Sequence, residues 1–68
     1  MVQIDVWRNK DAKSVQRVEF PSLDHAIGMH ARILHEELNG QPVSVFRDVE
    51  HRCWVIDSTV STFFLKEV

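Results

Sequence analysis

Residues 20–40 read FPSLDHAIGMHARILHEELNG and predict a single amphipathic helix with well-defined ends. Ser22 is a favourable N-cap, and Asp24 lies near the positive end of the helix dipole. Gly40, followed by Pro42, predicts the end of the helix, because glycine accepts the left-handed cap and proline cannot continue the helix. This helix is the strongest local signal in the chain and organises the fold prediction.

One side of the predicted helix is apolar. At about 100° per residue, the apolar face collects Leu23, Ala26, Ile27, Ile33, Leu34 and Leu38. His30 and Glu37 also fall on this face. Two interpretations of this pair stay open. In one, His30 donates to a backbone carbonyl at the edge of the core and Glu37 reaches solvent. In the other, the two residues border a site that recognises a partner.

Segments with alternating apolar and polar residues flank the helix and predict strands. They cover residues 2–7, 14–20, 42–49 and 52–58, while residues 63–68 form either a short fifth strand or a tail. The order β-β-α-β-β(-β) predicts one α+β domain over residues 1–68, with the helix on one face of a mostly antiparallel sheet.

The predicted strands leave large apolar side chains on the sheet face away from the helix. Trp7 and Phe46 alternate with the apolar residues of their own strands and so point outward, whereas Trp54 can take either face. An exposed apolar patch of this kind is typical of an interface. The alternative is that the fifth strand or a bend in the sheet covers it.

Length and composition restrict the class of protein. A chain of 68 residues buries only about 60% of its unfolded surface, so association with a second copy, giving a homodimer, is one route to stability. Its single cysteine, Cys53, excludes an internal disulfide and favours the cytoplasm. No apolar stretch approaches the ~20 residues that cross a bilayer, and the first residues do not form a signal peptide, so no membrane association is expected.

The histidines do not predict a metal site. His25, His30 and His35 are each five residues apart, which turns each side chain by about 140° from the last on a helix. Zinc ligands must instead converge on one ion at about 2.0–2.3 Å. No metal or other cofactor is therefore expected.

His51, Cys53 and Asp57 fall on one strand face and resemble a catalytic set in residue type only. Alternate residues of a strand stand about 6.5–7 Å apart, beyond hydrogen-bond reach for short side chains. No helix N-terminus is available to lower the pKa of the thiol. We therefore expect no catalytic residue and no enzymatic activity.

The first predicted hairpin supports an alternative function. It places Trp7 among Arg8, Lys10, Lys13 and Arg17. Basic side chains can neutralise phosphates while an aromatic ring stacks on a base. Acidic residues interleave with them and the net charge is −2, so nucleic-acid binding by this hairpin is kept as the alternative hypothesis.

Two resemblances complete the interpretation. By size and layout the chain resembles small inhibitors carried by bacteriophages, including anti-CRISPR proteins, which are often single-layer α+β domains that block a host machine. Residues 18–27, VEFPSLDHAI, also resemble the strand-to-helix junction of HicB-like antitoxins. The first resemblance implies a phage or mobile-element inhibitor that binds a larger protein.

The favoured hypothesis is a non-enzymatic protein-interaction module that binds a larger protein, a second copy of itself, or both. The outer sheet face would supply its apolar contacts and the charged hairpin its border. The candidate partner-binding residues are Trp7, Arg8, Lys10, Lys13, Arg17, Phe46 and Trp54.

Overall fold

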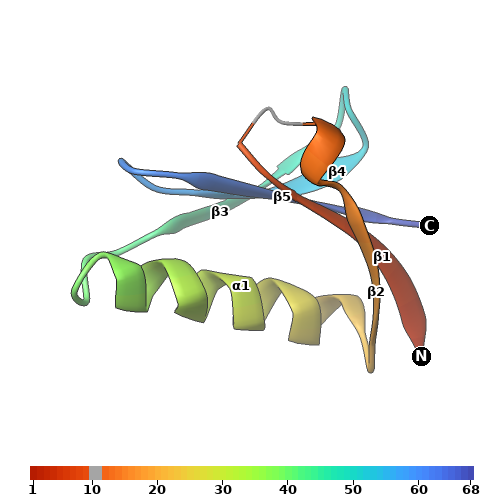
Figure 1. Cartoon of the computed structure of the whole chain (residues 1–68), viewed down its shortest axis with the longest axis horizontal. Coiled ribbons are helices and arrows are strands. Elements are labelled where there is room, and N and C mark those ends of the chain that lie inside the picture. Colours follow the sequence, from red (N-terminus) through yellow and green to blue (C-terminus); the bar gives the residue numbers. More distant parts are fainter. Residues whose placement is uncertain (10–11) are drawn as a thin grey trace.

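A five-stranded antiparallel sheet with one helix on one of its faces makes up the computed structural model, which describes residues 1–9 and 12–68 (Figure 1). This arrangement confirms the predicted α+β fold. The strand order is β2-β1-β5-β4-β3. The elements are β1 (Val2–Arg8), a short 3-10 helix (Ala12–Ser14), β2 (Gln16–Phe20), α1 (Leu23–Glu37), β3 (Ser44–Asp48), β4 (Cys53–Asp57) and β5 (Thr62–Glu67).

The C-terminal segment forms a strand, and that strand lies inside the sheet. β5 pairs with β1 on one side and with β4 on the other. Its Leu65 is fully buried on the side of α1, while Phe64 points to the opposite face. The apolar run Phe63–Leu65 suits this central position, because a strand paired on both edges packs its side chains against neighbouring strands on each face.

The N-terminus of α1 follows the prediction. The Ser22 hydroxyl accepts a hydrogen bond from the backbone N–H of His25 at 3.1 Å, which satisfies one of the free donors of the first turn. Asp24 lies in that turn, where its charge complements the helix dipole.

The C-terminus of α1 differs by one residue from the prediction. Asn39 takes the left-handed cap position with φ 55°, and Gly40 follows with φ 87°. The N–H of Asn39 donates to the Glu36 carbonyl at 3.1 Å, and that of Gly40 to the His35 carbonyl at 2.9 Å. These paired hydrogen bonds form a Schellman motif, in which asparagine rather than glycine occupies the first left-handed position.

The core lies between α1 and the sheet. α1 packs across β1, β2, β4 and β5, whereas β3 is held mainly by its pairing with β4. The fully buried apolar side chains of this layer are Ile4, Ala26, Leu34, Ile56 and Leu65. No helix in the described residues is long and apolar enough to cross a bilayer.

Candidate functional site

The sheet face turned away from α1, called here the outer face, carries an apolar row that crosses four strands. Trp7 of β1 pairs with Phe64 of β5. Phe64 pairs in turn with Val55 of β4, which pairs with Phe46 of β3. Opposite residues of an antiparallel ladder point to the same face, so these four side chains form one continuous row, called here the outer-face row.

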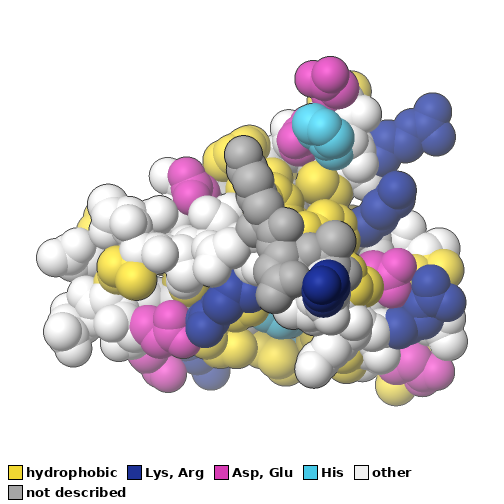
Figure 2. Space-filling model, turned by 45° about the horizontal axis from the view of Figure 1, so that its top comes forward, with side chains coloured by type: hydrophobic (Ala, Val, Ile, Leu, Met, Phe, Trp, Pro, Cys, Tyr) yellow, Lys and Arg dark blue, Asp and Glu magenta, His cyan; other side chains and the backbone are white. Residues whose placement is uncertain are grey.

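The row is packed at one end and exposed at the other. Trp7 and Phe64 stack with their ring centroids 5.5 Å apart and an interplanar angle of 11°. Val55 is buried beside them, whereas 47% of Phe46 is exposed. Figure 2 turns this side toward the viewer and shows hydrophobic side chains at the surface among charged groups. The predicted outward placement of Trp7 and Phe46 is confirmed, and β5 extends the patch instead of covering it.

A cavity of about 510 Å³ lies next to the packed end of the row. Its lining combines the Trp7 and Phe64 rings with Cys53, with Asp48 at the end of β3, and with His51 from the turn that follows. The cavity thus has aromatic walls and a polar border. This is the combination that lets a surface hold an apolar anchor while polar groups fix its orientation.

A local ion pair shapes the polar border. His51 donates to Asp48 twice, from Nδ1 to Oδ2 at 2.8 Å and from its backbone N–H to Oδ1 at 3.2 Å. These hydrogen bonds lower the pKa of Asp48, and the carboxylate raises the pKa of His51. The pair closes the turn and places a carboxylate and an imidazole in the lining of the cavity.

The His51, Cys53 and Asp57 set is not assembled. His51 turns to Asp48, and Asp57 accepts a hydrogen bond from the Thr62 hydroxyl at 2.7 Å. Only 2% of Cys53 is exposed, and its burial raises the pKa of the thiol. Cys53 therefore acts as a small apolar residue under the cavity and not as an activated nucleophile.

Trp54 belongs to the opposite face. It pairs with Leu65 and Arg47 and packs against the core on the side of α1. The Arg47 guanidinium lies 5.7 Å from its ring centroid. Trp54 is therefore not part of the outer face, because the register of β4 turns its side chain toward the helix.

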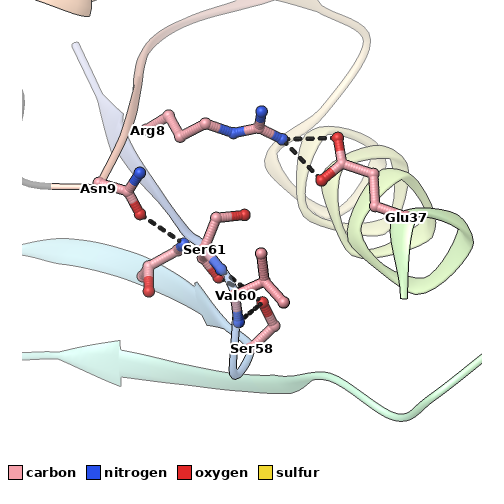
Figure 3. A network of polar contacts seen from close by, with 7 residues as sticks. Arg8, Asn9, Glu37, Ser58, Val60 and Ser61 are labelled. Atoms are coloured by element: carbon pink, nitrogen blue, oxygen red, sulfur yellow. Dashed lines mark hydrogen bonds and ion pairs between the residues drawn. The ribbon is translucent and has the colours of Figure 1, made fainter.

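Arg8 and Arg17, two cations of the first hairpin, lie on opposite faces of the sheet. Arg17, on the outer face, donates from Nε and Nη2 to the Asp5 carboxylate at 2.9 and 3.3 Å. Arg8 points to the side of α1, where its Nη2 donates to both carboxylate oxygens of Glu37 (Figure 3). Its guanidinium lies 4.6 Å from the Phe63 ring centroid. Both arginines are thus neutralised by carboxylates and face opposite ways.

Lys10 and Lys13 are the remaining cations among the candidate partner-binding residues. Lys13, in the 3-10 helix, has an exposed side chain. Lys10 lies outside the described residues. The register of β1 and β2 places Arg8 and Arg17 on opposite faces of the sheet.

His30 and Glu37, the two polar residues on the apolar face of α1, have different partners. Only 8% of His30 is exposed, and its Nδ1 donates to the Ala26 carbonyl at 2.8 Å. This confirms its interpretation as a satisfied residue at the edge of the core. Glu37 is exposed but pairs with Arg8, and Phe63 lies between Arg8 and His30, 4.9 Å from the imidazole centroid. Arg8 of β1 and Phe63 of β5 therefore connect Glu37 to His30 through a series of contacts.

Sequence reasoning missed Phe64, Val55 and Asp48 as members of the outer surface. One signal was present, because Phe63 and Phe64 are adjacent and a strand must place one ring on each face. Which ring joins Trp7 depends on the pairing of β5 with β1, and that pairing is not a local property of the sequence.

Comparison of the chain with protein-family models, with curated proteins and with solved structures found no match. Among residues 1–9 and 12–68, no three His, Cys, Asp or Glu side chains gather as metal ligands. The outer face is therefore the feature of the molecule from which a function can be inferred.

Proposed function

We propose that this chain is a non-enzymatic protein-interaction module that binds a larger protein through its outer face. The observation that carries this proposal is the outer-face row, together with the aromatic-walled cavity beside it. Within residues 1–9 and 12–68, the helix packs on the other face of the sheet only, which leaves the row available to a partner. Apolar surface gathered in one place on a small domain is typical of a binding site.

The expected partner presents an apolar or aromatic side chain that enters the cavity. Trp7 and Phe64 would supply most of the binding free energy, because aromatic residues in a desolvated pocket are the usual hot spots of an interface. Asp48 and His51 would surround this contact with polar groups and exclude water from it. Phe46 would extend the apolar contact toward β3.

The resemblance to phage-carried inhibitors suggests how such a module acts. We propose that it blocks the larger protein by occupying one of its working surfaces, which requires no chemistry from this chain. The buried, unpaired Cys53 is in keeping with a reducing compartment, so we place the module in the cytoplasm.

Nucleic-acid binding by the first hairpin stays the alternative. The ion pairs of Arg8 with Glu37 and of Arg17 with Asp5 weaken it, because phosphate contacts would have to compete with these carboxylates. The protein-binding proposal needs no such exchange.

Affinity capture from an extract of the source organism, with and without nuclease, tests the proposal. We expect a stoichiometric protein partner whose capture resists nuclease. Trp7→Ala should weaken the affinity for this partner at least about 30-fold, as expected for a hot spot. The control is Met29→Ala, which removes an exposed apolar side chain from α1 and should keep the partner.

Two outcomes would count against the proposal. Retention of the partner by a folded variant with both Trp7→Ala and Phe46→Ala would show that the outer face is not the site. Loss of binding on nuclease treatment, with a steep salt dependence and abolition by Lys10→Glu and Lys13→Glu, would establish the nucleic-acid alternative.

A further inference from the structure

β3 is the least supported strand of the sheet. It forms one edge and lies beyond the strands on which α1 packs, and β4 is the only strand of the described residues that pairs with it. Two of its apolar side chains are exposed, on opposite faces: 43% of Val45 on the side of α1 and 47% of Phe46 on the outer face. The strand therefore exposes apolar surface on both faces as well as the free backbone groups of an edge.

This edge has only part of the usual protection against pairing with another strand, namely the charged residues Arg47 and Asp48. Natural edges carry lysine, proline or a bulge that discourages association. Ser44–Asp48 contains neither lysine nor proline, and its ladder with β4 runs without a bulge. On the outer face the opposite edge, β2, presents the charged side chains Arg17 and Glu19, whereas β3 presents Phe46 between Ser44 and Asp48. The two edges thus differ, and β3 is the one open to a further strand.

We infer that β3 pairs antiparallel with β3 of a second copy of this chain, about a two-fold axis through Phe46. Phe46 is the central residue of Ser44–Asp48, so this register gives every residue of the strand a partner in the other copy. Ser44 faces Asp48, Val45 faces Arg47, and Phe46 faces Phe46.

The side chains fit this self-pairing. The Ser44 hydroxyl can donate to the Asp48 carboxylate, and Val45 packs on the aliphatic stem of Arg47 on the side of α1. No like charges stand directly opposite each other; the two Arg47 side chains are diagonal neighbours, about 7–8 Å apart. A two-fold axis through Arg47 would instead bring two guanidinium groups face to face, which is unfavourable.

The resulting dimer has one ten-stranded sheet and one outer face. Phe46 is the exposed end of the outer-face row, so the two rows meet at the axis and form a single apolar band across both copies. The additional burial compensates for the small core of a 68-residue domain. The dimer requires only the chain itself, so this inference does not depend on the proposed binding of a larger protein.

Cysteine cross-linking of the purified full chain tests the register. In a Cys53→Ala background, Phe46→Cys should form a disulfide-linked dimer on mild oxidation, because opposite residues of an antiparallel pair have Cα atoms about 4.5–5.5 Å apart, within the range of a disulfide. Val45→Cys in the same background is the matched control. It is almost equally exposed, but it faces Arg47 and not its own copy, so it should remain unlinked; Val45→Cys with Arg47→Cys should link.

Light scattering provides an independent measurement. For the wild-type chain we expect a molecular mass equal to two chains. Phe46→Lys should halve this mass and leave the circular dichroism spectrum unchanged. A monomeric wild type, equal cross-linking of Phe46→Cys and Val45→Cys, or a dimer that survives Phe46→Lys would overturn the inference. Cross-linking of Phe46→Cys should persist when Trp7→Ala is added. This combination distinguishes dimer formation from binding of the larger protein, which Trp7→Ala should weaken.

Discussion

The Nη2 atom of Arg8 lies 2.8 and 3.0 Å from the two carboxylate oxygens of Glu37, so the last residue of β1 is tied to the last residue of α1. The guanidinium also covers the Phe63 ring, which in turn contacts His30. This chain of contacts closes one end of the layer between helix and sheet. It also explains why two polar residues lie on an otherwise apolar helix face.

Glu37→Gln should lower the free energy of unfolding by no more than about 1 kcal/mol, because the Arg8 and Glu37 side chains are 42% and 45% exposed and solvent screens their attraction. The loss should shrink as salt is added. Urea unfolding at low and high salt measures both effects. Glu36→Gln, one residue earlier in α1, is the control; an equal, salt-sensitive loss in that variant would show that the ion pair contributes nothing specific.

The Asp48–His51 pair should make stability depend on pH. The raised pKa of His51 means that its contribution is complete below the usual value of about 6.5 and is lost as the pH rises through the raised value. The lowered pKa of Asp48 means that its contribution is complete above about 3.9 and is lost as the pH falls through the lowered value. The pair should therefore stabilise the turn most between these limits.

NMR titration of the His51 ring checks the upper limit. Its pKa should fall in Asp48→Asn, which removes the negative charge, and should be unaffected in Asp57→Asn, which removes a carboxylate from the far end of β4. The same titration curve in Asp48→Asn and the wild type would rule out the ion pair as the cause.

Substitution by alanine should change the stability of the protein in opposite directions at the two glycines. Gly28 lies in α1 with nothing within 4 Å of an added Cβ, so Gly28→Ala should stabilise the protein by about 0.5–1 kcal/mol. Gly40 has φ 87°, and Gly40→Ala should destabilise it by about 1–2 kcal/mol. Thermal unfolding of both variants measures the contrast. Asn39→Gly should be neutral or stabilising because Asn39 is also left-handed; a clear loss there would contradict the observed cap.

The two tryptophans should separate folding from binding. Trp54→Ala removes a ring packed on the core and should destabilise the fold by on the order of 3 kcal/mol, while the folded fraction keeps its affinity for a partner. Trp7→Ala should lose the partner at a smaller cost in stability, including the stacking with Phe64, worth about 0.5–1.5 kcal/mol. Chemical unfolding and a binding assay on the same samples measure both. Loss of affinity in well-folded Trp54→Ala would contradict its assignment to the helix side.

Local patterns in the sequence determined the secondary structure of this protein. The spacing of apolar residues and the Ser22 cap place α1, since helix periodicity and capping involve neighbours within a few residues. Alternation in the strands likewise places Trp7 and Phe46 on the outer face. These features follow from short stretches of chain and needed no knowledge of what each strand pairs with.

Only the tertiary structure decided how the strands are ordered and which side chains meet. β5 is the last strand in the chain, yet it joins β1 to β4, and this pairing brings Phe64 onto Trp7 and turns Trp54 toward α1. The pairing of Arg8 with Glu37 also spans distant parts of the chain. Such contacts depend on the burial and hydrogen bonding of the whole sheet, because a one-residue shift of register would exchange the two faces of a strand.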